Sequence, residues 1–262
     1  MVVIFGRMLV GTLFILIFLK PLRNLQYRKG DWKYLGFMGL CEPCLYFIFE
    51  ALALENTSAS QAGMITGTLP LIVGVVAWLV LKEKMNLRTI SGFVLAIIGI
   101  VLLSGGSIVT ENAPNPLFGN IMEFLAMVTA TGYIITLKKL SDRYSSLFLT
   151  TFQAFIGAIF YFPLLFLPTT ELTTVVDPFS AFAILYLGVF VTFGAYGSYN
   201  YAVSKVPASQ AGAFINLIPV FTMIMGWAFL GDQLTTPQYF AVALVFAGIY
   251  LSQYKNGIAK SA

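Results

Sequence analysis

The chain has 262 residues, of which 58 % are apolar and 10 % are charged, and its mean hydropathy is +0.86. A soluble domain usually carries about 25 % charged residues, so this composition excludes a soluble two-domain protein and a disordered chain. The 15 basic residues against 11 acidic ones are too mild an excess for a nucleic-acid-binding protein, and the absence of histidine removes the commonest general base and metal ligand.

Nine apolar stretches approach or exceed the length of about 20 residues that a helix needs to cross a bilayer. In chain order they are Met1–Leu19, Tyr34–Leu54, Ser58–Leu81, Leu87–Leu103, Phe118–Leu137, Ser146–Leu167, Phe179–Tyr201, Ala208–Leu230 and Pro237–Tyr254. The first stretch is followed by a basic cluster and has no small-residue cleavage site, so it is a span rather than a signal peptide. The sequence therefore predicts an all-α polytopic membrane protein.

The charged residues between these stretches are sorted by side. When successive breaks are assigned to alternate sides of the membrane, 14 of the 15 Lys and Arg residues fall on the side reached after the first span. The other side receives Glu55, Glu111, Glu171, Asp177 and Asp232. Because cytoplasmic loops are rich in Lys and Arg, we expect cytoplasmic basic loops, a cytoplasmic C-terminus and residence in a bacterial inner (plasma) membrane.

The chain repeats itself after 149 residues. The shift places Ala59–Gly63 on the identical Ala208–Gly212 and, without a gap, Pro70 on Pro219. It advances the chain by five spans, and because five is odd, corresponding helices would cross the membrane in opposite directions, as in the inverted repeats of many secondary transporters. The same shift places the start of the first copy before Met1, so we expect one N-terminal helix to be missing.

The repeated motif carries a resemblance to a known family. Thr57–Ala62 is followed by Leu69-Pro70, Trp78 and Lys82–Lys84, and a second copy lies downstream. With these features the whole chain resembles the EamA-type domains of the drug/metabolite transporter superfamily. The resemblance implies a ten-helix fold of two inverted five-helix repeats around a central cavity, of which this chain would hold nine helices. The corresponding division is 1–104 for the first repeat, 105–117 for an extracytoplasmic linker, 118–254 for the second repeat and 255–262 for a cytoplasmic tail.

Four charged residues lie inside the predicted spans: Arg7, Glu42, Glu50 and Glu123. A charge in hydrocarbon is costly, so such residues face a cavity or one another. Arg7, Glu50 and Glu123 have similar depths in the outer half, so we expect Arg7 to pair with Glu50 or Glu123 at a solute site. The alternatives are a structural ion pair and side chains that snorkel to the membrane interface. Glu42 lies nearer the midplane beside Pro43 and is a candidate for proton coupling, or else a residue that bonds a neighbour in a kinked helix.

Uncharged polar residues supply further candidates. The helix-breaking prolines Pro70 and Pro219 are expected near the midplane, where irregular backbone lines a cavity or is buried in protein. Candidate solute contacts are Gln61, Thr66, Thr68, Gln210 and Asn216 near these prolines, Tyr196, Tyr199 and Asn200 on the seventh span, and, more weakly, Tyr133 and Gln153. The alternative is helix packing, which the Gly63-x-x-x-Gly67 spacing also favours.

Cys41 and Cys44 have the spacing of a redox or metal motif, but no histidine or third cysteine completes a site, so we expect no metal or cofactor. We expect a secondary active transporter of small organic metabolites, amino acids and amines among them, that works by alternating access and with proton coupling as an option. The alternatives are a non-transporting or truncated membrane subunit and, less favoured, an intramembrane lipid-modifying enzyme. The expected partners are the bilayer and a small solute, with no nucleic acid; the sequence does not specify an oligomeric state.

Overall fold

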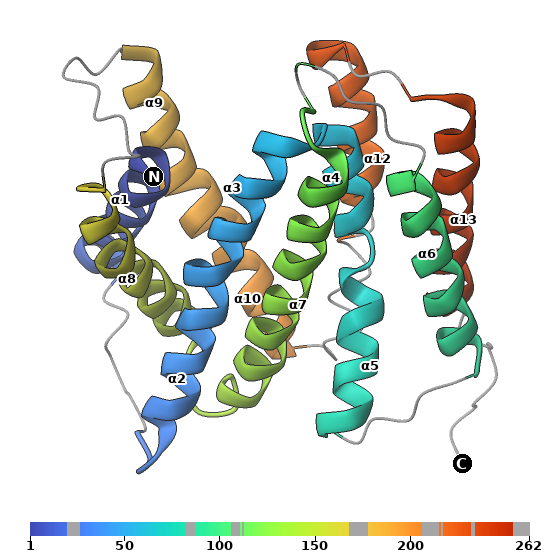
Figure 1. Ribbon diagram of the computed structural model, residues 1–262. Coiled ribbons are helices and arrows are strands. Elements are labelled where there is room, and N and C mark those ends of the chain that lie inside the picture. Colours follow the sequence, from blue (N-terminus) through green and yellow to red (C-terminus); the bar gives the residue numbers. More distant parts are fainter. Residues whose placement is uncertain are drawn as a thin grey trace, which may run out of the picture. The chain divides into compact units, whose positions relative to one another are not determined.

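A computed structural model describes residues 1–19, 27–81, 87–105, 111, 113–167, 178–205, 215, 217–231 and 234–253 (Figure 1). These residues are mostly helical, and the described part of the chain contains no β-strand. The predicted all-α class is therefore confirmed.

The helices follow the apolar stretches of the sequence. The first part of the chain forms α1 (Val2–Leu19), α2 (Asp31–Gly39), the π-helical segment η1 (Leu40–Leu45), α3 (Tyr46–Asn56), α4 (Ala59–Thr66), α5 (Leu69–Leu81) and α6 (Leu87–Gly105). The second part forms α7 (Pro116–Leu140), α8 (Ser146–Leu164), α9 (Pro178–Tyr186), the π-helical segment η2 (Leu187–Ala195), α10 (Tyr196–Lys205), α12 (Leu217–Met225), η4 (Gly226–Leu230) and α13 (Thr236–Gln253).

Among the described residues, five helical stretches are long and apolar enough to cross a membrane. They are Asp31–Asn56, Ala59–Val80, Pro116–Leu140, Ser146–Leu164 and Pro178–Lys205. Shorter apolar helices occupy Val2–Ile17, Ile90–Leu103, Ile218–Leu230 and Thr236–Leu251. Such helices are typical of a polytopic membrane protein. The predicted count of nine spans, and their arrangement as inverted repeats, stay predictions.

The chain divides into two compact units. Unit 1 contains Met1–Ile48 and Gly132–Ala211, and unit 2 contains Phe49–Thr131 and Gly212–Ala262. The boundaries fall inside α3 and α7, so each of these helices contributes a segment to both units. Each unit also draws helices from both halves of the sequence, so the compact units differ from the predicted repeats, whose boundaries stay a prediction.

In unit 1, α1 packs against α8 and η2. Its apolar core is formed by Met8, Phe47, Ala154, Ala158 and Tyr161. Glycines bring α1 and η2 close together: a Cβ added at Gly188 would lie 2.5 Å from the Val10 side chain, and one at Gly11 would lie 2.7 Å from the Thr192 side chain. Small residues at helix contacts are how helices approach closely in membranes.

In unit 2, α6 packs along α13 and α4 packs against α12 (Figure 1). The 149-residue shift relates Gly99 on α6 to Gly248 on α13, and both lie where the two helices touch. A Cβ at Gly248 would be 2.5 Å from the Gly92 carbonyl oxygen, and one at Gly99 would be 2.9 Å from the Ala241 carbonyl oxygen. Helices that correspond in the predicted repeat therefore pack on each other through corresponding glycines.

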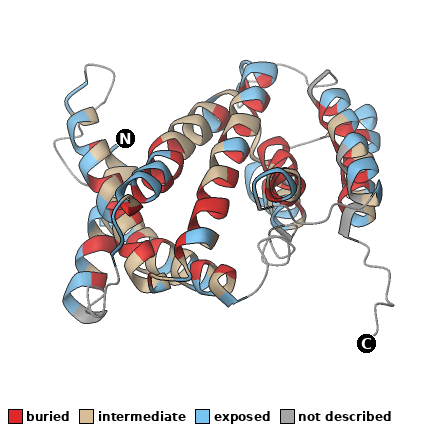
Figure 2. Cartoon of the chain, turned by 90° about the horizontal axis from the view of Figure 1, so that it is seen from below, coloured by how far each residue is buried: buried red, intermediate tan, exposed pale blue. Residues whose placement is uncertain are grey.

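The α4–α12 contact is equally close. A Cβ at Gly63 would overlap the Thr222 side chain, and one at Gly67 would lie 2.8 Å from the Pro219 ring. The Gly63-x-x-x-Gly67 spacing therefore serves helix packing, as its sequence suggests. Many of the most exposed residues on the helices are large and apolar, such as Phe179 and Phe229, of which 77 % and 79 % is exposed. Figure 2 shows exposed stretches alternating with buried ones along the helices, as expected where one face meets lipid.

Candidate functional site

A buried polar cluster in unit 2 joins the α3–α4 turn to α7. The Thr57 hydroxyl donates to Asn120 Oδ1 at 2.8 Å, and Asn120 Nδ2 donates to Gln61 Oε1 at 3.1 Å. All three side chains are buried. The turn can approach α7 because position 119 is glycine: a Cβ there would lie 2.8 Å from the Thr57 backbone nitrogen. Ser58 caps α4 by accepting a hydrogen bond from the Gln61 N–H at 3.3 Å.

Glu123 lies one helical turn beyond Asn120 on α7 and belongs to the same region. Its carboxylate oxygen Oε1 accepts a hydrogen bond from the Thr66 hydroxyl at 2.9 Å. Its other oxygen, Oε2, is buried and has no hydrogen-bond partner among the described residues. Glu50 on α3 is close enough to Glu123 for the two carboxylates to interact electrostatically.

The Glu123 carboxylate is not fully compensated for its burial. Only 2 % of Glu123 is exposed, and a buried carboxylate that keeps an open oxygen costs free energy unless a proton or a cation meets it. A neighbouring carboxylate makes full ionisation of the pair still less favourable. The site is therefore suited to hold a proton or a positively charged group between polar amides and hydroxyls.

Thr68 and Pro70 serve the helix break rather than this cluster. The chain turns at Gly67-Thr68 between α4 and α5, and the Thr68 hydroxyl donates to the Ile65 carbonyl oxygen at 2.6 Å. Pro70 is buried in the first turn of α5, where its missing N–H is tolerated. Pro219 occupies the first turn of α12 and is also buried. The predicted candidates Gln210 and Asn216 lie outside the described residues.

A second buried polar network lies in unit 1. The Tyr133 hydroxyl lies 2.8 Å from Gln153 Oε1 and 2.7 Å from Asn200 Oδ1, and it can donate its single hydrogen to one of them at a time. Asn200 Nδ2 donates to the Thr150 hydroxyl at 2.9 Å. The network ties α7, α8 and α10 together, and all four side chains are buried. Tyr133 and Gln153, the weaker candidates from the sequence, thus form this network together with Asn200.

We expect Tyr133→Phe to destabilise the protein by about 1–3 kcal/mol, because the Gln153 and Asn200 amides lose a buried partner. Thermal unfolding in detergent micelles measures the effect. The control is Tyr186→Phe on α9, where the ring is half exposed and a hydroxyl should matter little. Equal unfolding temperatures for the two variants would show that the network does not stabilise unit 1.

Glu42 lies at a break in the helix between α2 and α3. Its backbone is extended (φ −147°, ψ 120°), and the Tyr161 hydroxyl lies within hydrogen-bond distance of the carbonyl oxygens of Pro43 and Cys44, at 3.1 and 2.7 Å. Pro43 packs against position 157, where a Cβ would lie 2.6 Å from its ring and only glycine fits. The predicted proline kink is therefore present.

The Glu42 side chain is buried and interacts electrostatically with Tyr133 and Tyr199. The Tyr199 hydroxyl is buried without a hydrogen-bond partner among the described residues. Tyr199 and Asn200 thus lie around Glu42 and Tyr133, whereas Tyr196 packs against the apolar core of unit 1. Cys41 and Cys44 are free, buried thiols, and the described residues contain no cluster of potential metal ligands.

Arg7 has two described contacts, both within unit 1. Its Nε donates to the Thr192 hydroxyl at 3.3 Å, and its guanidinium lies 4.7 Å from the centroid of the Phe47 ring. A cation over an aromatic face is stabilised where water is scarce. The predicted pairing with Glu50 or Glu123 joins residues of different units and stays a prediction.

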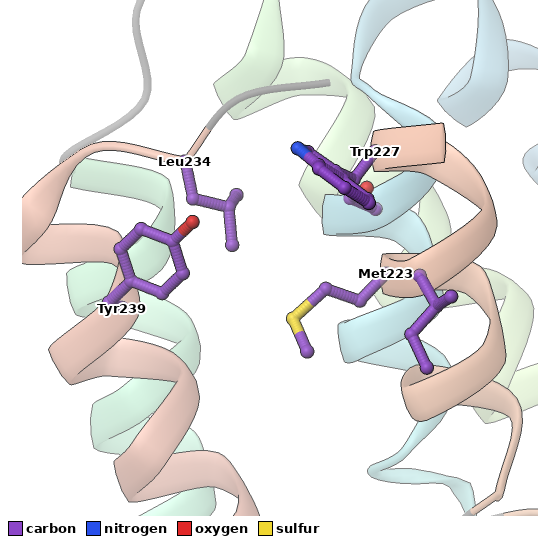
Figure 3. A pocket seen from close by; sticks show the side chains of 6 residues that line it. Met223, Trp227, Leu234 and Tyr239 are labelled. Atoms are coloured by element: carbon purple, nitrogen blue, oxygen red, sulfur yellow. The ribbon is translucent and has the colours of Figure 1, made fainter. Parts of the chain in front are cut away.

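A hollow of about 220 Å³ lies in unit 2 between the junction of α12 with η4 and the start of α13 (Figure 3). It is lined by Ser60, Met223, Ile224, Trp227, Leu234 and Tyr239. Figure 3 shows the Trp227 and Tyr239 rings on opposite sides of the opening. Its lining is largely apolar, so it lacks the charged groups that distinguish the Glu123 region.

Apolar helices with buried carboxylates and amides are typical of an integral membrane protein. The profile of the EamA-like transporter family matches residues 1–105 and 117–254. The chain therefore belongs to the EamA-like transporter family, and the predicted membership is confirmed. The family assignment indicates a membrane transporter rather than an enzyme.

Individual relatives agree with this assignment. The uncharacterized transporter YetK of Bacillus subtilis is 27 % identical over 216 residues, which cover 81 % of this chain and 65 % of YetK. An uncharacterized transporter of Archaeoglobus fulgidus is 24 % identical over 96 % of this chain and 87 % of its own. The chloroplastic WAT1-related protein At3g02690 of Arabidopsis thaliana is 24 % identical over 90 % of this chain and 58 % of its own. One solved crystal structure shares the fold, with a TM-score of 0.65 and 16 % identity over 95 % of this chain and 87 % of its own.

Proposed function

We propose that this protein is a secondary active transporter of small cationic or zwitterionic organic solutes, such as amines and amino acids. The observation that carries the proposal is the open, buried oxygen of Glu123, with Glu50 nearby and Thr66 bonded to the other oxygen. A solute ammonium group can donate a hydrogen bond to this oxygen, and its positive charge balances the negative charge of the carboxylate. Uncharged polar groups come from Asn120, one turn before Glu123 on α7, and from Gln61 on α4, which is hydrogen-bonded to Asn120.

Proton exchange fits the same chemistry. In the absence of solute a proton occupies the Glu50–Glu123 pair, and the solute cation replaces it, so that the buried charge stays balanced throughout the cycle. Alternating access of the site between the two sides of a bacterial inner membrane, with the basic loops cytoplasmic, completes the proposed mechanism. The sorting of Lys and Arg along the sequence supports this orientation.

The test is uptake by purified protein in proteoliposomes, with a panel of amino acids, amines, sugars and organic anions, each measured with and without a pH gradient. We expect saturable uptake of at least one cationic or zwitterionic solute, and faster uptake when the gradient drives protons the other way. Uptake confined to anions or sugars would contradict the proposed solute class. No flux of any solute would contradict the carrier function itself.

A further inference from the structure

The start of α2 and the residues just before it present an exposed group of cations and aromatic rings. Tyr27, Arg28, Lys29, Trp32 and Lys33 are all exposed, with 60 % of Tyr27 and 64 % of Trp32 accessible. Lys33 Nζ lies 5.8 Å from the centroid of the Trp32 ring. We call these five residues the basic-aromatic patch.

An ion pair between the buried Asp31 and the partly buried Arg143 holds the patch in position. Asp31 Oδ1 pairs with Arg143 Nη2 at 2.9 Å. Its Oδ2 accepts hydrogen bonds from the Tyr144 hydroxyl at 2.9 Å and from the Arg28 backbone N–H at 3.1 Å. Burial of Tyr144 and its bond to Asp31 raise the pKa of the phenol. The turn before α2 is therefore anchored to the α7–α8 turn within unit 1.

The other described cations nearby already bond to an oxygen atom or a carboxylate, whereas those of the patch form no ion pair with a described residue. Lys138 Nζ donates to the Val203 carbonyl oxygen at 2.9 Å, and Lys139 Nζ donates to the Tyr34 hydroxyl at 2.9 Å. By contrast, Arg28, Lys29 and Lys33 form no ion pair within the described part of the chain. Three exposed positive charges are thus left to meet a partner from outside.

The position of the patch indicates which class of molecule this partner belongs to. It spans the start of the apolar helical stretch Asp31–Asn56, with Tyr27, Arg28 and Lys29 just before it and Trp32 and Lys33 in its first turn, so it lies where the hydrocarbon ends and the headgroups begin. Trp and Tyr favour this depth, and clusters of Lys and Arg next to a span attract anionic lipids. We propose that the basic-aromatic patch is a binding site for the headgroup of an anionic phospholipid such as phosphatidylglycerol. The site faces the cytoplasmic leaflet in the proposed topology.

The experiment measures contact between Trp32 and phospholipids in the full chain, by the quenching of tryptophan fluorescence. With Trp78→Phe and Trp227→Phe, Trp32 is the remaining tryptophan, and its fluorescence is quenched by phospholipids brominated near the ester end of the acyl chain. The protein is placed in nanodiscs that contain brominated phosphatidylglycerol in unbrominated phosphatidylcholine, or the reverse. Both leaflets share one composition, and no transport is measured, so the result is independent of the proposed topology and solute.

We expect Trp32 to favour phosphatidylglycerol over phosphatidylcholine by about five- to tenfold, given the attraction of each cation to an anionic surface. In the triple variant Arg28→Gln/Lys29→Gln/Lys33→Gln, the preference for phosphatidylglycerol should fall to about onefold. The control is Lys82→Gln/Lys84→Gln/Arg88→Gln, which removes the same charge from another predicted cytoplasmic loop. In this control the preference should remain. In the parent, raising salt from about 0.05 M to about 0.5 M should weaken the preference.

Three results would overturn the site. They are equal quenching by both lipids in the parent, an equal loss of preference in both triple variants, or a preference that survives removal of the patch cations. The salt titration needs no charge-removing variant, and a preference that does not change with salt would also contradict an electrostatic headgroup site.

Discussion

Glu123→Gln is expected to reduce solute uptake by about 100-fold or more, because the amide cannot supply the negative charge that the solute cation meets in the buried site. Uptake of the solute identified in proteoliposomes measures the effect. The variant should unfold at the parent's temperature or higher, since replacing a buried charge by a neutral group of equal size relieves its desolvation cost. Loss of transport without loss of stability separates a functional carboxylate from a structural one.

Two further variants sharpen this result. Thr66→Val removes the hydroxyl that donates to Glu123 Oε1 but leaves the charge, so it should weaken transport much less than Glu123→Gln. Glu50→Gln should alter the response to a pH gradient, since Glu50 is the neighbouring carboxylate of the pair. Parent-like uptake and pH response in both glutamate variants would remove the pair from the mechanism.

Gly248→Ala is expected to destabilise the protein by about 1–3 kcal/mol. The added Cβ would lie 2.5 Å from the Gly92 carbonyl oxygen and 2.8 Å from the Ala96 backbone nitrogen, so α6 and α13 must move apart. Backbone atoms cannot rotate away as a flexible side chain can. Thermal unfolding in detergent micelles should therefore show a clear loss, which exceeds the gain in helix propensity on replacing glycine.

The matched control is Gly36→Ala on α2. A Cβ there meets nothing within 4 Å, so this variant should unfold at the parent's temperature or slightly above it. If Gly248→Ala behaved in the same way, the close α6–α13 contact would not contribute to stability.

The helices could be predicted from hydropathy because each coincides with an apolar stretch between charged or turn-rich segments. Local backbone changes were predictable only where proline marks them. Pro43 indicates the kink between α2 and α3, whereas the π-helical segment Leu187–Ala195 contains no proline and gives no such sign. The division into two units also could not be predicted, because it depends on which helices pack together and not on their order.

Several individual residues of the candidate site could be predicted from the sequence, but the hydrogen-bonded clusters that they form could not. Glu123, Gln61 and Thr66 are each unusual in an apolar span, and that is a sequence signal. Asn120 and Thr57, which complete the cluster, are ordinary polar residues near span ends. The one available sign was that Asn120 precedes Glu123 by three residues and so shares its helix face. Nothing in the sequence indicated that Thr150 belongs to the polar network of unit 1.

The composition of the two units sets an order of assembly during synthesis. The main packing partners of α1, which are α8 and η2, come more than a hundred residues later in the chain, so these contacts form only after both segments have been made. Unit 1 has all its helices once α10 has been inserted, whereas α4 and α6 in unit 2 still lack α12 and α13. A nascent chain arrested after Lys205 would therefore hold one assembled half and one half whose glycine faces are still exposed to lipid.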